Sequence, residues 1–267
     1  MIVRVYGLSV AGLPRNASPD CSPPPDVTIR QTRVALPRPT ATPGGRCVVA
    51  LPAGQRLILD RGSRTATFVG DPVDDDELMH PHMSLIAQAF NRWAGRDALH
   101  AGVIELGGSA WLLLGANEAG KSTLLAYLAT RGVSVLADDL AVTDGEVVFS
   151  GPRSLDLRDR PPWLELAVRA VRGGSRLRLA LPAAPERLPL GGWIVLGAGE
   201  EPRLERVAGS DTVAVLLGAR RPMPRLPSTP DVLFKLATSP GWTLTRPLGW
   251  QALPATAELL CRIVTRS

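Results

Sequence analysis

The chain has 267 residues, of which 45% are hydrophobic, so it is long enough to bury a full core and to form one domain or two. Its formal net charge is +5 and nearly all the positive charge is arginine, spread too widely to indicate a nucleic-acid protein. No apolar run approaches the roughly 18 residues of a membrane span. The composition therefore favours a globular protein with no nucleic-acid or membrane partner.

The cysteines and the start of the chain bear on its compartment. The three cysteines are odd in number and scattered, which favours a reducing compartment over a disulfide framework: Cys21, Cys47 and Cys261. Met1–Leu13 lacks the sustained apolar stretch of a signal peptide. We expect a cytoplasmic protein, and self-association into a homo-oligomer stays open.

The first quarter of the chain has the pattern of a small β-rich module. Asn16–Pro25 is a loop, because its serine, aspartate and run of prolines sustain neither helix nor sheet. Short β-branched runs between proline or glycine turns predict strands at Met1–Val10, Val27–Ala35, Arg46–Leu51, Gln55–Leu59 and Thr65–Val69. We place the end of this module at residue 75, which leaves residues 76–267 as the second domain.

An acidic run and two histidines open the second domain. Asp74–Glu77 is typical of a solvated linker or a first helical turn, and a metal site is the alternative. Apolar residues then follow helical spacing over Leu78–Trp93. His80 and His82 flank a proline at the helix start; cap or surface roles are favoured there over metal binding, which would need further ligands.

A glycine-rich motif then follows a short apolar strand, Trp111–Leu114. The motif is G-x-x-x-x-G-K-S-T, a Walker A phosphate loop, and consists of Gly115, Ala116, Asn117, Glu118, Ala119, Gly120, Lys121, Ser122 and Thr123. Its glycines let backbone N–H groups converge on phosphate oxygens, aided by the positive end of the following helix. Lys121 would reach the β- and γ-phosphates, and the Ser122 hydroxyl would bind Mg²⁺.

A helix and a second strand lead from this motif to a pair of carboxylates. Apolar spacing predicts a helix over Lys121–Arg131, ended by Gly132, and a strand over Val133–Ala137. Asp138 and Asp139 follow directly. Acidic residues at the end of a strand beside a phosphate loop suit a Walker B role, with one carboxylate for the metal and the other for a hydroxyl proton. A solvated turn is the alternative.

The remaining residues predict an alternation of strands and helices. Asp144-Gly145 marks a hairpin turn. Arg176 and Arg178 lie on a predicted strand, where they either reach a substrate carboxylate or phosphate or simply face solvent. Gly151–Leu157 is a loop that leads into a short strand, and further strands are predicted at Arg176–Leu181, Gly192–Leu196 and Trp242–Pro247. Helices are predicted at Pro161–Val171, Asp211–Leu217, Asp231–Thr238 and Leu253–Val264.

Residues His80–Leu140 resemble the HPr kinase/phosphorylase-like kinases. The resemblance lies in Leu99-His100-Ala101 before the phosphate-loop strand, the GxxxxGKST loop, Arg131-Gly132 and Ala137-Asp138-Asp139. It implies an α/β fold with a P-loop core of the HPr kinase type, residues 76–267 as the kinase domain, ATP and Mg²⁺ as cofactors, and His100 in the active site near the transferred phosphate.

The match is closest to shorter relatives that phosphorylate serine on peptides, including kinases that accompany lasso-peptide biosynthesis. The glycine-rich signature that longer members use for dephosphorylation is absent between Leu155 and Leu190. The expected reaction is transfer of the γ-phosphoryl group of ATP to a serine hydroxyl of a peptide or small protein. Lys121, Asp138, Asp139 and His100 are then catalytic, with Asp138 favoured as base and Ser122 and Asp139 on the metal. A nucleotide-binding regulatory module and a small-molecule kinase are the alternatives.

Overall fold

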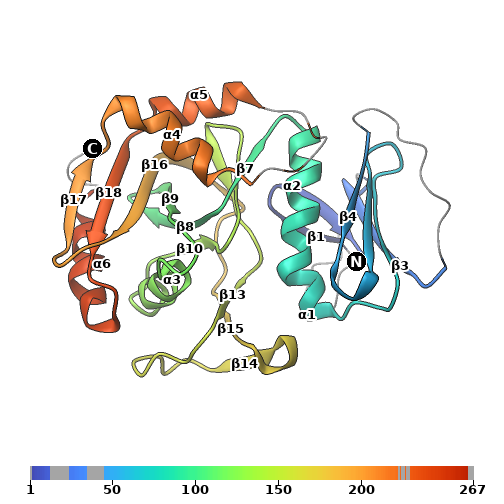
Figure 1. Cartoon of the computed structure of the whole chain (residues 1–267), viewed down its shortest axis with the longest axis horizontal. Coiled ribbons are helices and arrows are strands. Elements are labelled where there is room, and N and C mark those ends of the chain that lie inside the picture. Colours follow the sequence, from blue (N-terminus) through green and yellow to red (C-terminus); the bar gives the residue numbers. More distant parts are fainter. Residues whose placement is uncertain are drawn as a thin grey trace. The chain divides into compact units, whose positions relative to one another are not determined.

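The computed structural model describes residues 2–12, 24–34, 45–221, 223, 226 and 229–263 (Figure 1). Cys21 and all but the last two residues of the predicted loop Asn16–Pro25 lie outside these ranges. By its internal contacts the chain divides into two compact units, Met1–Asp97 with Pro222–Thr229 and Ala98–Arg221 with Pro230–Ser267. The boundary that the sequence placed at residues 75 and 76 precedes the helix that belongs to the first unit, and the division into a β-rich module and a kinase domain stays a prediction.

A six-stranded sheet forms most of the first unit, in the order β1-β2-β3-β6-β5-β4. Its strands are β1 (Ile2–Val5), β2 (Leu8–Ala11), β3 (Val27–Thr32), β4 (Arg46–Ala50), β5 (Arg56–Asp60) and β6 (Thr65–Val69). The predicted strand Met1–Val10 is two strands, because Tyr6 and Gly7 turn with positive φ. The other predicted strands of this unit are confirmed within a few residues.

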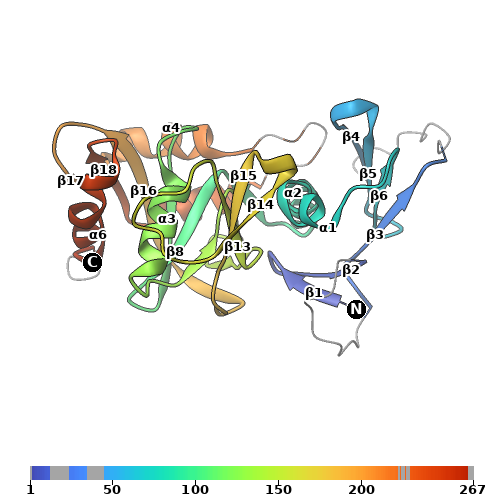
Figure 2. The ribbon, with the colours of Figure 1, turned by 90° about the horizontal axis from the view of Figure 1, so that it is seen from below.

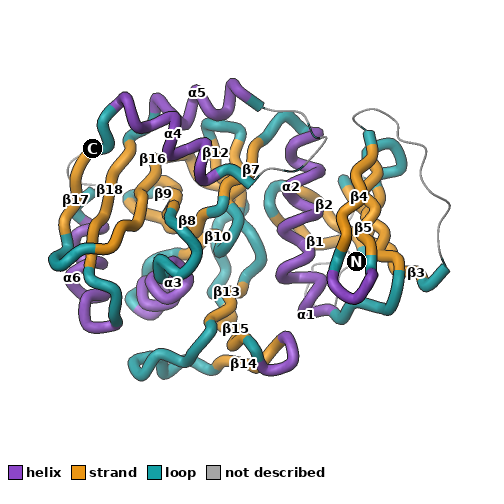
Figure 3. Tube along the Cα trace, viewed as in Figure 1, coloured by secondary structure: helices purple, strands orange, loops and turns teal. Residues whose placement is uncertain are grey.

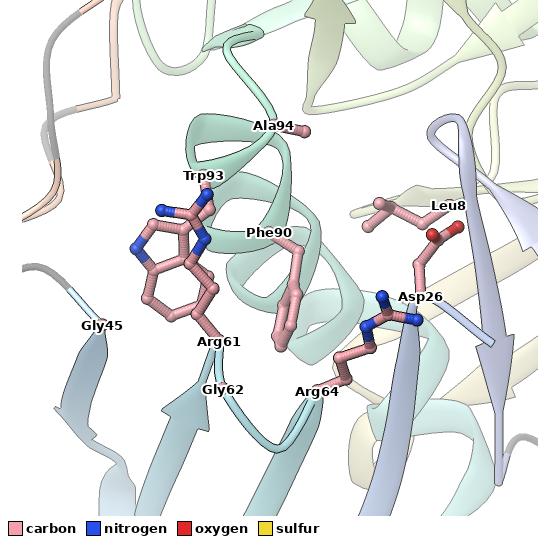
Figure 4. Close-up of a pocket in the computed structure, with 9 residues that line it drawn as sticks. All are labelled: Leu8, Asp26, Gly45, Arg61, Gly62, Arg64, Phe90, Trp93 and Ala94. Atoms are coloured by element: carbon pink, nitrogen blue, oxygen red, sulfur yellow. The ribbon is translucent and has the colours of Figure 1, made fainter. Parts of the chain in front are cut away.

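A short turn of helix, η1 (Pro52–Gly54), separates β4 from β5, and three consecutive helical segments follow β6: α1 (Asp75–Glu77), η2 (Leu78–His82) and α2 (Met83–Trp93). The Asp74 carboxylate accepts a hydrogen bond from the Glu77 N–H at 2.8 Å, so the acidic run caps a first helical turn, as expected. Residues of α2, the β5–β6 turn and the adjoining strands line a hollow of about 540 Å³ (Figure 4). Phe90 and Trp93 form its apolar wall, with ring centroids 5.1 Å apart.

A nine-stranded mixed sheet is the centre of the second unit, with the path β10-β8-β9-β16-β12-β11-β7 and β18 and β17 attached beside β16. Its strands are β7 (Asp97–Leu99), β8 (Ala101–Leu106), β9 (Ser109–Leu114), β10 (Val135–Ala137), β11 (Ala141–Thr143), β12 (Val147–Phe149), β16 (Arg187–Ala198), β17 (Arg203–Arg206) and β18 (Gly241–Arg246). β9, β16 and β18 run parallel, so their carboxyl ends meet at one edge.

Helices cover both faces of this sheet, and Figure 3 distinguishes them from the strands by colour. On one face α3 (Lys121–Thr130) lies against β8 and α6 (Leu253–Cys261) lies against α3 (Figures 1 and 2). On the other face the buried Trp193 of β16 donates its indole N–H to the Leu236 carbonyl of α5 (Pro230–Thr238), which packs on α4 (Gly209–Ala219). The fold is therefore mixed α/β, with several sheets.

A small three-stranded sheet corrects one prediction. The segment Pro161–Val171, predicted to be helical, contains no helix and ends in a strand, β14 (Val168–Val171). β14 pairs antiparallel with β15 (Arg176–Ala180), and β15 pairs with β13 (Ser154–Leu157). The turn between β14 and β15, η3 (Arg172–Gly174), has three consecutive residues with positive φ, which brings the two strands together. Strand pairing at this hairpin overrides the helical spacing.

Candidate functional site

The glycine-rich loop lies between a buried parallel strand and a helix, as its motif predicts. β9 ends at Leu114, and the first residue of α3 is Lys121. Glu118 and Gly120 both have left-handed φ, +69° and +76°, and turn the chain into the helix. The first N–H groups of a helix have no partner within it, so those of α3 are directed toward the loop. The loop also leaves the sheet at the edge where parallel α/β sheets bind ligands.

Lys121 is folded back onto this loop. Its side chain is buried, and its Nζ donates hydrogen bonds to the carbonyl oxygens of Gly115 at 2.7 Å and Ala116 at 2.9 Å. Burial lowers the pKa of Lys121, and the charges of Asp138 and Asp139 oppose that shift. The lysine is therefore held inside the loop by carbonyl dipoles, and a bound anion would stabilise its charged form.

The two carboxylates at the end of β10 have different surroundings. Asp138 is buried and accepts a hydrogen bond from Ser122 Oγ at 3.1 Å. Burial, followed by the charge of Asp139, raises the pKa of Asp138 from its usual 3.8 to about 6. Asp139 has a left-handed φ of +68°, and its Oδ1 lies 3.1 Å from His100 Nδ1. The sequence placed the two acids together, and the structure shows which of them faces the loop.

An arginine that the sequence did not single out holds the strand before these acids. Arg153 donates to the carbonyl oxygens of Leu136 at 3.1 Å and Val135 at 2.7 Å. It also donates to the Pro182 carbonyl oxygen from Nε at 2.9 Å. The guanidinium thereby ties β10 to the segment after β15. Arg153 and Leu136 are 17 residues apart in the sequence. Only the fold brings them together, so no local sequence pattern indicated this role.

His100, Asp139 and Arg221 form a second cluster beside the acidic pair. Arg221 Nη2 lies 2.5 Å from Asp139 Oδ1 and 2.7 Å from His100 Nδ1. The same Nδ1 lies 3.1 Å from Asp139 Oδ1 and 3.1 Å from the Asp139 carbonyl oxygen, so one ring nitrogen faces both Arg221 and Asp139. His100 Nε2 is buried, with no hydrogen-bond partner among the described residues. The histidine that the sequence singled out therefore contacts one member of the acidic pair, Asp139.

Sequence reasoning missed Arg221. The residue follows α4, and its neighbour Arg220 bridges to Leu99 beside His100. The backbone N–H of His100 also donates to the Ala219 carbonyl oxygen at 2.7 Å. These contacts join segments about 120 residues apart, and no local pattern in the sequence links them.

The two arginines proposed for a substrate carboxylate have different positions on β15. Arg178 is buried and holds Asp156 with two hydrogen bonds, Nε to Oδ1 at 2.7 Å and Nη2 to Oδ2 at 3.0 Å. Arg172 Nη2 adds a contact to the same carboxylate at 3.1 Å. Arg178 is thus occupied by a carboxylate of the chain itself, which leaves Arg176 as the half-exposed arginine of the pair.

The other candidate ligands of the sequence lie elsewhere. His82 lies at the N-cap position of α2, but its side chain makes no capping hydrogen bond. It is buried in the first unit, where its ring meets that of Phe68 edge-on at 5.2 Å, so the predicted surface role is wrong. Within the described ranges, no group of three or more histidine, cysteine, aspartate or glutamate side chains could hold a metal ion. In that same part of the chain no helix is long and apolar enough to span a membrane.

Comparisons with known proteins find likeness among solved structures. No family model and no curated protein matches the sequence. Among solved structures, the HPr(Ser) kinase/phosphatase from Coxiella burnetii is similar, at 12% sequence identity and a TM-score of 0.34. The similarity covers 63% of this chain and 97% of that one.

Proposed function

We propose that this chain is an ATP- and Mg²⁺-dependent kinase that transfers the γ-phosphoryl group to a serine hydroxyl of a peptide or small protein. The observation that carries the proposal is the meeting of Lys121, Ser122 and Asp138 at a glycine-rich loop between a strand and a helix. Positioning and charge neutralisation account for most of the catalysis in phosphoryl transfer. A lysine, a hydroxyl and a carboxylate at such a loop are the groups that these two effects require.

The residues at the loop fit a polyphosphate with its metal ion. Lys121 is a buried cation without an ion-pair partner among the described residues, and phosphate oxygens are stronger acceptors than the carbonyls it now holds. Ser122 and Asp138 present adjacent oxygen atoms, which suit a hard cation. Mg²⁺, when bound, supplies neutralisation of phosphate charge. Lys121 would leave its carbonyl partners to bind the β- and γ-phosphates.

The contacts favour a particular division of labour between the two carboxylates. The hydrogen bond from Ser122 supports Asp138 as the metal-side carboxylate, which reverses the allocation expected from the sequence. Asp139 is then the carboxylate that takes the proton of the acceptor hydroxyl. The hydroxyl oxygen bonds to the γ-phosphorus, and the bond between the γ-phosphorus and the bridging β-phosphate oxygen breaks. His100 and Arg221 orient Asp139, and their contacts to its Oδ1 support that role.

The chain's two lysines provide a matched test of this proposal. Lys121→Ala should abolish phosphate transfer and weaken nucleotide binding, with the fold intact. Lys235→Ala removes an exposed lysine paired with Glu146 and should leave both unchanged. Transfer is measured by mass spectrometry of serine peptides with ATP and Mg²⁺, and binding by calorimetry. Wild-type transfer by Lys121→Ala rejects the assignment, whereas nucleotide binding by the wild type without any transfer indicates a regulatory nucleotide-binding module.

The acceptor is the finer part of the proposal. The sequence resemblance to peptide-serine kinases supports a peptide, including a ribosomal natural-product precursor of the lasso-peptide type. The half-exposed Arg176 supports an acidic group or chain terminus near the serine, because arginine binds carboxylates in a bidentate manner. Candidate peptides are compared with free-acid and amidated ends, and the free acids should be preferred. Efficient phosphorylation of a sugar or nucleoside, with every peptide inert, would favour the small-molecule kinase instead.

A further inference from the structure

A second buried cation lies against the phosphate loop. Arg246 is the last residue of β18, and its side chain is 3% exposed. Its Nη2 donates to the Ala119 carbonyl oxygen at 2.9 Å, and its Nη1 donates to the Pro247 carbonyl oxygen at 3.3 Å. Nε is buried, with no hydrogen-bond partner among the described residues. The arginine and the loop residue it holds are 127 positions apart in the sequence.

The guanidinium approaches the loop so closely that it restricts the residue before α3. A Cβ on Gly120 would lie 2.6 Å from Arg246 Nη2, closer than such atoms approach. Gly120 also has a φ of +76°, which side chains other than glycine rarely adopt. The second glycine of the motif is therefore required by its backbone conformation, and a side chain there would have to displace the end of the Arg246 guanidinium.

The charge of Arg246 is not balanced within the described part of the chain. No carboxylate there forms an ion pair with it, and its contacts are to carbonyl dipoles. Burial lowers the pKa of the guanidinium. A buried charge is costly unless an opposite charge or a full set of hydrogen bonds compensates it. The loop that Arg246 touches is where an anion would supply that compensation.

We propose that Arg246 is a positioning residue of the phosphate loop, which fixes the Ala119–Gly120 peptide for a bound polyphosphate whose negative charge balances the buried guanidinium. The inference rests on the proposed function. Lys121 and Arg246 now hold carbonyls at opposite ends of the loop, Gly115 and Ala116 for the lysine and Ala119 for the arginine. On binding, Lys121 exchanges its carbonyls for phosphate oxygens, whereas Arg246 keeps Ala119 and preserves the direction of the N–H groups that follow.

The test measures ligand-free stability and nucleotide affinity together. Arg246→Met keeps the apolar stem and removes the charge, and Arg246→Lys keeps the charge and loses the planar fork. Calorimetry with Mg²⁺–ATP and Mg²⁺–ADP should show about tenfold to a hundredfold weaker binding by Arg246→Met, equal for the two nucleotides because both use the same loop. Arg246→Lys should recover part of the affinity. Without nucleotide, Arg246→Met should melt at or above the wild-type temperature, because an uncompensated charge has been removed.

The control variant and the contrary outcomes separate this role from a structural one. Arg206→Met removes an arginine that stacks on Trp242 in the same part of the sheet, 4.7 Å from its ring centroid, and should leave nucleotide affinity unchanged. A lower melting temperature for Arg246→Met, with wild-type affinity at temperatures where it is folded, overturns the inference. If the wild type binds no nucleotide, the proposed function fails and this inference fails with it.

Discussion

Two groups of buried charge lie in the second unit, and they are compensated in opposite ways. Asp156 and Arg178 meet through two parallel hydrogen bonds, with side chains 3% and 7% exposed. At the phosphate loop, Lys121 and Arg246 are equally buried but hold backbone carbonyls, and no described carboxylate forms an ion pair with either. The first group is an ion pair within the chain, whereas the two cations of the second have no carboxylate in ion-pair contact among the described residues.

Burial also shifts the pKa values of the charged groups at the loop. Burial lowers the pKa of Lys121 and of Arg246 and raises that of Asp138, so each of these groups is shifted toward its neutral form. Perturbed groups gathered in one place are typical of functional sites. The comparison therefore separates Asp156–Arg178, a pair that is compensated within the chain, from the loop charges, for which we propose a polyphosphate and its metal ion as the ligand.

The largest expected effect is the loss of transfer rate when either member of the acidic pair is replaced. Asp138→Asn and Asp139→Asn should each reduce the rate of transfer by about two to four orders of magnitude, since metal charge and proton acceptance are both required. Asp138→Asn should also weaken Mg²⁺-dependent nucleotide binding, and Asp139→Asn should not. Single-turnover rates and calorimetry measure the two effects, with the exposed Asp159→Asn as control. The opposite pattern of binding would return the metal role to Asp139, and near-wild-type rates for both variants would remove the pair from the chemistry.

Breaking the balanced pair should cost stability and leave binding intact. Asp156→Asn leaves Arg178 buried without its carboxylate, for which about 3–5 kcal/mol is the usual loss. Urea unfolding measures it, and Glu201→Gln, which removes one partner of an exposed pair with Arg203, should cost less than about 1 kcal/mol. The affinity of folded Asp156→Asn for ATP should remain that of the wild type. A large loss of affinity would contradict the division between the two groups.

The raised pKa of Asp138 predicts a pH dependence of ligand-free stability. The folded protein keeps this proton up to about pH 6, whereas the unfolded chain loses it near 3.8. The folded state thus binds more protons between these values, so the stabilising contribution is full below about pH 4 and is lost as pH rises to about 6. A shift of this size corresponds to about 3 kcal/mol. Urea unfolding of wild type and Asp138→Asn is measured between about pH 4 and 7.5. The difference between their free energies of unfolding should change up to about pH 6 and then level off. A difference that stays constant from about pH 4 to 6 would contradict the prediction.

The elements next to the loop could be predicted because their signals are local. A buried strand, a glycine-rich turn and a helix follow one another within Trp111–Thr130, and the acidic pair comes within ten residues of that helix. The failures also have a local cause. Pro161–Val171 has helical spacing, but its last residues pair with β15 across a hairpin. The turn of that hairpin depends on positive φ angles, which the spacing of apolar residues does not predict.

The contacts that complete the site could not be predicted, because they depend on strand order. β18 lies parallel to β16, and β16 parallel to β9, which brings Arg246 to the edge where the loop begins. Arg221 reaches His100 because the end of α4 bridges to the strand beside that histidine. Both arginines are single residues in a chain with many, and nothing in their neighbours along the sequence distinguishes them.

The smallest expected effect concerns an ion pair on the outside of the same loop. Arg158 Nη1 lies 2.5 Å from Glu118 Oε1, but the two side chains are 58% and 68% exposed. Solvent screens such a pair, and ordering two long side chains opposes it, so their coupling should be below about 1 kcal/mol. A double-mutant cycle of Arg158→Ala and Glu118→Gln in urea unfolding measures it, and ATP affinity should change less than about fivefold in either variant. A coupling of several kcal/mol would place Arg158 with Arg246 as a support of the loop. The distance in this exposed pair is shorter than that between Arg246 and Ala119, so the cycle also tests whether burial, more than distance, decides which arginine matters.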